Sequence, residues 1–324
     1  MVDVLEIHGE RVMPGETRRI ELPVARLPIH TMLHLPVTVV RGRRDGARLW
    51  LSAALHGDEL NGMEIIRRIL ERLQPERMQG TLIAVPIVNV FGFILQSRYL
   101  PDRRDLNRAF PGSKRGSLAS QLAHLFMDQV VSRCTHGIDL HTAAPPRNNL
   151  PQVRCNMKHP ETRRCAEAFG APVVLHGAGP KGTLRGAASS RGIPTLLYEA
   201  GESLRFDEQS IEIGVEGVLR VMGALEMLRR TDVPKRRASL YSERSSWVRA
   251  AQSGVLYMNT MLGARVRAHE PLAVITDPFG DAKVPVASPF DGVVVGQTNN
   301  ALVHRGDGLL HVAALKRSES RTSR

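Results

Sequence analysis

The feature that most constrains the fold is an apolar run that ends in polar residues, and the chain contains it twice. Residues 49–55 (LWLSAAL) form a run typical of a buried strand and lead directly into His56, with Glu59 three positions later. A second short run, residues 138–140, leads into His141. Because open α/β sheets bind ligands at the carboxyl ends of their strands, we expect both histidines at one edge of a sheet.

The two motifs together offer two imidazoles and one carboxylate. This is the ligand set of a catalytic zinc site that keeps its fourth position open for water. Asp139, two residues before His141, could orient that histidine from behind. A single His-x-x-Glu is weak evidence, since short motifs match by chance, and the alternative for His56 is a histidine that is satisfied in the core.

Helical spacing of apolar residues recurs along the first two thirds of the chain. Residues 59–73 are predicted to form a helix, with Asp58 as its N-cap. The same spacing predicts helices over residues 117–133, 161–169, 184–191 and 206–228. These helices alternate with apolar runs, so we expect an α/β domain with a mixed sheet flanked by helices.

Strand signals complete this pattern. The continuous apolar run at 81–88 predicts a fully buried strand. The turn at 43–46 (RRDG) predicts a hairpin that joins strands over 34–40 and 48–55.

The residue pattern of the sequence changes after the basic stretch 229–237. From there, short β-like runs separated by glycines predict a smaller all-β domain of barrel-sandwich type, similar to biotinyl and lipoyl carriers. Lys283 lacks the flanking residues of a carrier lysine, so we interpret it as an ordinary surface residue. The predicted division is an α/β domain over 1–235, a β-rich domain over 236–315 that serves as a lid or oligomerisation module, and a disordered tail over 316–324.

Composition limits the classes of partner. The formal net charge is +12, but arginines are spread along the chain and aromatic residues make up only 4%, so we expect no nucleic-acid partner. No apolar run approaches the roughly 20 residues that span a bilayer, and the N-terminus has no secretory pattern, so we expect no membrane partner. Three cysteines, an odd number, favour a reducing cytoplasm.

A loop between the two motifs adds basic and amide side chains. Residues 105–112 (DLNRAFPG) follow Arg98 and contain Asn107 and Arg108. An asparagine and an arginine in a loop can grip a carboxylate, because the guanidinium binds it in bidentate fashion. The alternative, a solvated basic loop, explains the arginines but not the Asn-Arg pair beside Phe-Pro-Gly.

A glutamate ends another apolar strand. Glu199 follows the run at 194–198, and an unpaired buried carboxylate there would be costly. Beside a metal site it could serve as general base and then general acid. The alternative is a strand-end carboxylate that pairs with a nearby arginine.

These four segments, HGDE, DLNRAFPG, DLH and EAG, occur in an order that resembles the succinylglutamate desuccinylase and aspartoacylase family, a branch of the zinc carboxypeptidase superfamily. The resemblance covers about residues 15–230. It implies a zinc-carboxypeptidase-like mixed sheet, usually followed by a β-domain. It also implies a zinc-dependent hydrolase that cleaves the amide bond of a small N-acyl amino acid.

The resemblance further implies a role for each motif residue. His56, Glu59 and His141 would bind one Zn²⁺ per subunit. Glu199 would be the general base that activates the attacking water.

Three residues between these motifs would handle the substrate. Arg98 would polarise the scissile carbonyl and stabilise the oxyanion. Asn107 and Arg108 would hold the substrate's carboxylate. The segment after Arg98 differs in length from the aspartoacylase form, so Arg103 and Arg104 are rivals for the role of Arg98.

The substrate stays open at this point. Relatives act on acyl aspartate, succinylglutamate or N-acetyl-diaminobutyrate, and neither Arg185 nor Arg191 matches a specificity residue of the family. The alternatives are a metallocarboxypeptidase acting on a peptide or peptidoglycan fragment and a non-catalytic ligand-binding relative. A small-molecule substrate is the expected partner, and a homo-oligomer stays open.

Overall fold

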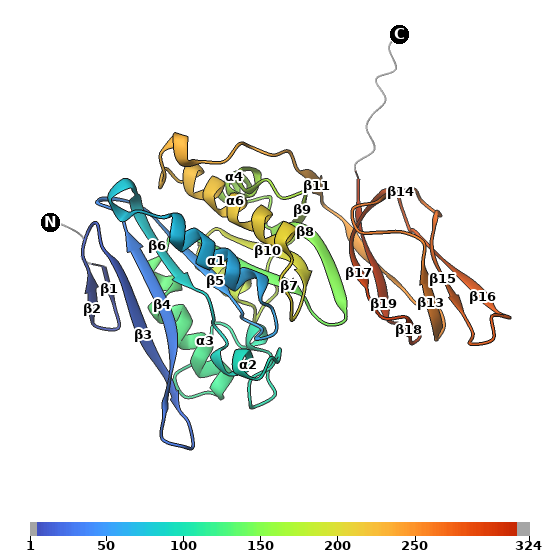
Figure 1. Ribbon diagram of the computed structural model, residues 1–324, viewed down its shortest axis with the longest axis horizontal. Helices are drawn as coiled ribbons and strands as arrows, with labels where there is room; N and C mark the ends of the chain where they lie inside the picture. Colours follow the sequence, from blue (N-terminus) through green and yellow to red (C-terminus); the bar gives the residue numbers. More distant parts are fainter. Residues whose placement is uncertain (1–4, 316–324) are drawn as a thin grey trace, which may run out of the picture.

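The computed structural model describes residues 5–315, so the predicted tail at 316–324 lies outside the described residues. The first part of the chain builds a large mixed sheet with helices, and the last part adds a smaller antiparallel sheet (Figure 1). The first part contains β1 (Leu5–Ile7), β2 (Glu10–Val12), β3 (Thr17–Arg26), β4 (Met32–Arg41), β5 (Arg44–Ala53), α1 (Asn61–Arg72), β6 (Gln79–Val85), α2 (Val90–Ile94), α3 (Leu118–Gln129), β7 (His136–Ala143), β8 (Arg147–Cys155), α4 (Pro160–Phe169), β9 (Val173–His176), α5 (Leu184–Ser190), β10 (Thr195–Glu202), α6 (Glu208–Ala224) and β11 (Leu240–Ser242).

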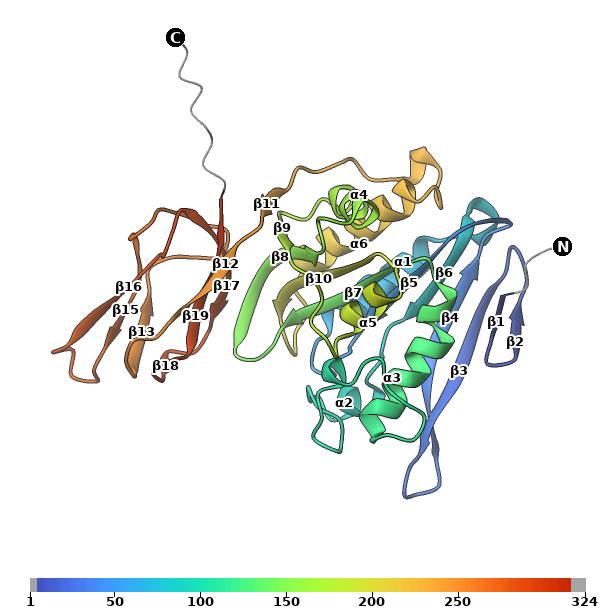
Figure 2. The same cartoon turned by 180° about the vertical axis from the view of Figure 1, so that it is seen from behind.

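Helices cover both faces of the large sheet. Helices α1, α4 and α6 lie on one face, where apolar side chains such as Ile66, Phe169 and Val218 form one core with the sheet. Helices α3 and α5 lie on the other face and pack with Trp50 and Phe126 in a second core (Figure 2). This arrangement confirms the predicted α/β class.

The centre of the sheet brings the ends of three strands together. Strand β5 pairs in parallel with β6 and β7, and β7 pairs in parallel with β10. The carboxyl ends of β5, β7 and β10 therefore meet at one edge of the sheet. His56 follows β5, while His141 and Glu199 lie near the ends of β7 and β10.

The predicted hairpin between the strands at 34–40 and 48–55 is wrong. Strand β6 lies between β4 and β5, antiparallel to the first and parallel to the second. A turn does connect β4 and β5, but the two strands do not pair with each other. Strand β6 takes the position between them because it is apolar on both faces, and its residues from Gly80 to Val85 are buried.

The second part of the chain is a β-sandwich, as its sequence predicts. It contains β12 (Ser245–Arg249), β13 (Gly254–Met258), β14 (Arg265–Val266), β15 (Pro271–Thr276), β16 (Lys283–Ala287), β17 (Gly292–Thr298), β18 (Leu302–Val303) and β19 (Gly308–Ala314). The sheet β16-β15-β13-β18 faces β12, β17 and β19 across a shared apolar core that includes Leu256, Ile275 and Leu310.

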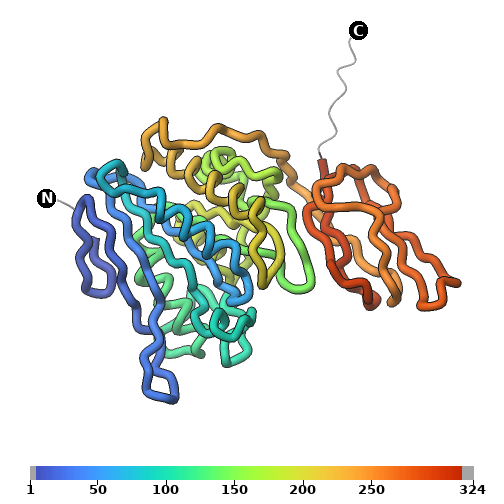
Figure 3. Tube along the Cα trace, in the orientation of Figure 1, coloured from blue at the N-terminus to red at the C-terminus, as the bar shows by residue number. Residues whose placement is uncertain are grey.

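The large sheet continues across the predicted boundary at residue 235. Strand β11 pairs with β9, and β17 pairs antiparallel with β8, so both parts share backbone hydrogen bonds. The trace in Figure 3 shows the second part beside the connection between β7 and β8, away from the N-terminal strands. The division at 235 therefore stays a prediction. Among residues 5–315, no helix combines the length and the apolar character needed to traverse a bilayer.

Candidate active site and metal centre

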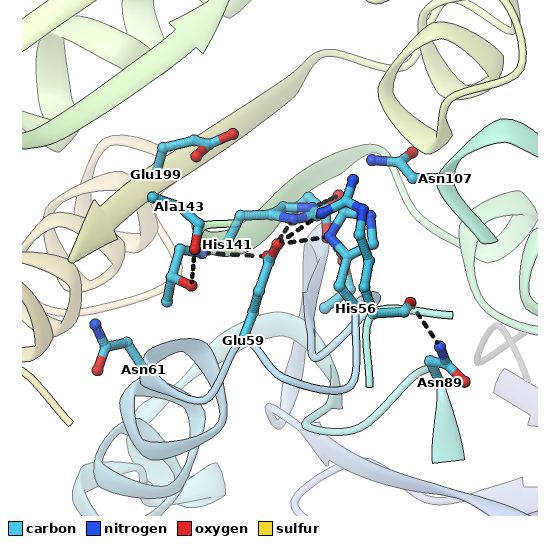
Figure 4. A network of polar contacts seen from close by, with 12 residues as sticks. His56, Glu59, Asn61, Asn89, Asn107, His141, Ala143 and Glu199 are labelled. Carbon is cyan, nitrogen blue, oxygen red and sulfur yellow. Dashed lines mark hydrogen bonds and ion pairs between the residues drawn. The ribbon is translucent and has the colours of Figure 1, made fainter. Parts of the chain in front are cut away.

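Glu59 lies between the two histidines that the sequence singles out. Its Oε1 is 2.7 Å from His56 Nδ1, and its Oε2 is 2.7 Å from His141 Nδ1. All three side chains are buried, and their ligand atoms lie within 4.8 Å of one another. Figure 4 shows the Glu59 carboxylate between the two imidazoles. The structure thus brings together the three predicted metal ligands.

The other nitrogen of each imidazole meets a second carboxylate. His141 Nε2 lies 2.7 Å from Asp139 Oδ2, and His56 Nε2 lies 3.2 Å from Asp105 Oδ1. Histidines that bind metals usually donate their remaining N–H to such a carboxylate, which leaves the opposite nitrogen free for the ion. The donor set and its supports therefore fit a divalent metal such as zinc.

The charged side chains at this centre shift one another's pKa values. Burial alone would lower the pKa of His141, but the carboxylates of Asp139 and Glu59 raise it well above its usual value. Burial opposes ionisation of Glu59, but His56 and His141 hold its pKa far below the usual range. The two histidines thus favour the ionised form of a buried carboxylate.

The turn that carries His56 and Glu59 differs from its prediction in one respect. Asp58 is not the N-cap of α1; Leu60 takes that position and no side chain caps the helix. Asp58 instead lies in the turn, where its backbone carbonyl accepts a hydrogen bond from Leu204 N at 2.8 Å. Asn61, at the start of α1, donates to Ala200 O and so ties this turn to β10.

Glu199 faces the same cavity as the metal ligands. The cavity has a volume of about 340 Å³ and is lined by His56, Glu59, His141 and Glu199. Asn149 Nδ2 donates to Glu199 Oε2 at 2.7 Å, while Oε1 lies 3.9 Å from Arg154 Nη1. The nearby arginine that the alternative interpretation required is therefore present, but the carboxylate still opens onto the cavity.

The loop residues also converge on this cavity. Arg98, Asn107 and Arg108 line it, whereas the rivals Arg103 and Arg104 do not and are exposed. Arg98 is paired with Asp105 at 3.0 Å and lies 3.3 Å from the Glu59 carboxylate.

Asn107 is fixed by its oxygen. Its Oδ1 accepts a hydrogen bond from Leu184 N at 2.9 Å. Figure 4 shows its amide nitrogen directed toward the histidines. Arg108 Nη1 donates to the backbone carbonyl of Asn107 at 2.7 Å.

Sequence reasoning missed the far wall of the cavity. Arg147, Arg154 and Trp247 line it, although no motif marks them. Arg185, which the sequence left without a role, also lines it, whereas Arg191 does not. Trp247 belongs to β12, so the second part of the chain contributes directly to the site.

A second group of metal-type ligands lies elsewhere, at His136, Glu161 and Cys165. Arg164 binds the Glu161 carboxylate and is the main cause that lowers the pKa of Glu161 to about 2. Burial raises the pKa of the Cys165 thiol to about 12. Since an arginine already neutralises the carboxylate and the thiol stays protonated, this group is poorly suited to a cation.

The chain is similar to known proteins of one family. The family model for the succinylglutamate desuccinylase/aspartoacylase catalytic domain matches residues 45–225. N-alpha-acetyl-L-2,4-diaminobutyric acid deacetylase of Halomonas elongata is 28% identical over 298 residues, covering 88% of this chain and 86% of the relative.

Solved structures share the architecture of both parts. The succinylglutamate desuccinylase/aspartoacylase from Rhodobacter sphaeroides has a TM-score of 0.82 and 26% identity, covering 93% of this chain and 96% of its own. The product-bound ectoine utilization protein EutE (DoeB) from Ruegeria pomeroyi shares the fold, with a TM-score of 0.81, 23% identity and coverage of 92% and 94%. Because the family model spans more than half of the sequence, the chain belongs to the succinylglutamate desuccinylase/aspartoacylase family.

Proposed function

We propose that this protein is a zinc-dependent deacylase that hydrolyses the amide bond of a small N-acyl amino acid. The proposal rests mainly on one observation. The His56-Glu59-His141 triad, whose histidines contact further carboxylates, and the separate Glu199 line one cavity. The family supports amide hydrolysis, and the Halomonas relative is a deacetylase of an N-acetylated amino acid.

His56, Glu59 and His141 are the residues that would hold the metal. A zinc ion there would lower the pKa of water and polarise the amide carbonyl. The protein's own contribution is orientation: Asp105 and Asp139 fix the two imidazoles through their Nε2 atoms.

Glu199 is the proposed proton carrier. Asn149 holds its Oε2, so Oε1 keeps a defined direction toward the cavity. We infer that Glu199 takes a proton from the attacking water and then delivers it to the leaving nitrogen. This sequence releases a carboxylic acid and an amino acid.

Arg98 and the Asn107–Arg108 pair are the proposed substrate contacts. Arg98 lies beside the metal ligands and can stabilise the oxyanion that develops on the carbonyl. The amide of Asn107 and the guanidinium of Arg108 can bind the α-carboxylate of the amino acid.

The size of the site favours small substrates over peptides, because the cavity has a volume of about 340 Å³ and Trp247 lines it on the side of the second part of the chain. The three cysteines are buried and unbridged, which supports a reducing compartment, and we propose the cytoplasm.

The test is hydrolysis of a panel of N-acetyl and N-succinyl amino acids by the zinc-loaded protein. Glu199→Gln should lower kcat by about 10³-fold or more, while Glu202→Gln, on the same strand but outside the cavity, should stay near wild type. Absence of turnover across the panel with zinc bound, or full activity of Glu199→Gln, would overturn the proposal.

A further inference from the structure

Arg147, the first residue of β8, lines the cavity. Its guanidinium lies over the Trp247 ring, with Cζ 4.5 Å from the ring centroid. Within residues 5–315 the structure shows neither a hydrogen bond nor an ion pair of this side chain. An arginine has five N–H donors in a planar fork, so this residue is held in place by stacking while its donors stay available.

The ring of Trp247 is positioned by its contacts with His311 and Gly308. Its other partner is His311, whose ring lies 4.9 Å away and is nearly parallel, at 8°. A Cβ at Gly308 would lie 3.0 Å from the indole, so the absence of a side chain there makes room for it. Burial, followed by Arg154 and Arg147, lowers the pKa of His311 to about 4, so near neutral pH the stack carries one charge, that of Arg147.

Strand pairing connects this stack rigidly to the catalytic strand. One row of the sheet runs from Gly201 of β10 through Asn149, Gly296 and His311 to Trp247. Asn149 is also the residue that holds Glu199. The second part of the chain thus places Trp247, and through it Arg147, at a fixed position relative to the general base.

The wall around Arg147 has more positive charge than the protein neutralises. Five arginines and two glutamates line the cavity, but Arg98 is already paired with Asp105. Of the other four arginines, only Arg154 has an ion pair among residues 5–315, at 3.9 Å from Glu199. Arg185 is only 8% exposed, and its side chain donates a hydrogen bond to the neutral carbonyl of Gly177. Arg154 Nε is buried and has no hydrogen-bond partner among the described residues. Arg185 is buried, and Arg147 and Arg154 are half-buried, so solvent screens these guanidinium groups only in part and they would attract an anion bound beside them.

We propose that Arg147, positioned by Trp247, is a specificity-determining residue that binds a second carboxylate on the substrate. The inference rests on the proposed deacylase function for the first carboxylate and the amide. It assigns the substrate to N-acyl amino acids with two carboxylates, the second one on either the amino-acid side chain or the acyl group. A side-chain ammonium group would meet the same arginines and be repelled.

The first measurement is binding, which needs no turnover. Calorimetric titration of the zinc-loaded protein with glutarate and with butyrate compares a dicarboxylate with a monocarboxylate. We expect glutarate to bind about 10- to 100-fold more tightly, and this ratio to collapse in Arg147→Met. Arg244→Met is the matched control, because Arg244 stacks on Phe290 in the same way but outside the cavity. Equal binding of the two acids by wild type, or an unchanged ratio in Arg147→Met, would overturn the inference.

Kinetics then identify the arm that carries the second carboxylate. Two pairs of substrates differ only in the second carboxylate: N-acetylglutamate and N-acetylnorvaline, and N-succinylalanine and N-butyrylalanine. In wild type, kcat/KM should be higher for the dicarboxylate of one pair. Arg147→Met should lower this ratio of kcat/KM values, mainly by raising the KM of the dicarboxylate. Trp247→Leu should lower the same ratio, and Trp247→Tyr should restore most of it by keeping a ring under Arg147. A general loss of kcat for both pairs would show a structural role instead. Turnover failure with an intact glutarate preference would refute the deacylase proposal alone.

Discussion

The two walls of the cavity differ in how many polar partners the protein gives to their charged side chains. On the metal side, Glu59 contacts both histidines and Asp139 contacts His141. On the opposite side, Arg147 has only the face of an indole as its partner. The carboxylates of the first wall can bind a cation, and the guanidinium groups of the second wall can bind an anion. A substrate that bridges them must be negatively charged at the end away from the amide.

Loss of a metal ligand should break the first wall and have the largest effect. Glu59→Ala removes the partner of both imidazoles, so we expect substoichiometric zinc and a fall in kcat of about 10³-fold or more. Elemental analysis of the purified protein and hydrolysis assays check this. Zinc bound at wild-type stoichiometry would place the metal elsewhere.

A change behind the metal ligand should weaken that wall without removing it. Asp139→Asn keeps the size of the side chain but loses the carboxylate that faces His141 Nε2. Zinc affinity should drop about 10- to 100-fold, measured by competition with a chelator. Ser52→Ala, which removes only the hydroxyl that donates to Asp139 at 2.7 Å, should have a smaller effect. Equal affinities for all three proteins would contradict this account.

A methyl group under the indole should disturb the second wall alone. Gly308→Ala places a Cβ 3.0 Å from Trp247, so the ring and the stacked Arg147 must shift. We expect the preference for a dicarboxylate to fall about tenfold, with zinc stoichiometry unchanged. An unaltered glutarate-to-butyrate ratio would show that the position of the ring does not matter.

A charge pair outside both walls should affect only stability, and modestly. Hydrogen bonds from Arg67 and then Arg68 lower the pKa of Glu64 to about 2. A depressed carboxyl pKa stabilises the folded state above the unfolded value of 4.5, and this contribution is lost as the pH falls toward 2. Glu64→Gln should therefore lower the free energy of unfolding by about 1 kcal/mol at pH 7.

The pH series gives the decisive comparison for this pair. The difference between Glu64→Gln and wild type, followed by urea denaturation, should shrink between pH 4.5 and pH 2. Glu71→Gln is the control, because Glu71 is more exposed and contacts Arg67 alone. A difference that stays constant with pH would exclude the charge as its cause.

The sequence predicted the first wall because its residues occur in short motifs at strand ends. His56, Glu59 and His141 are each preceded by recognisable strands, and parallel pairing then brings them together. The N-cap assigned to Asp58 was wrong because Leu204, far along the chain, holds that turn. The second wall could not be predicted, since Arg147 and Trp247 meet only through the register of β8, β17, β19 and β12.

The most direct test is a crystal structure of zinc-loaded Glu199→Gln, recorded with anomalous scattering at the zinc edge. The ligand is N-acetylglutamate or N-succinylalanine, whichever compound the kinetic pairs show to depend on Arg147. We expect one zinc peak bounded by His56, Glu59 and His141, with the second carboxylate of the ligand against Arg147. A zinc peak at His136, Glu161 and Cys165 instead, or a ligand whose second carboxylate faces solvent, would contradict this prediction.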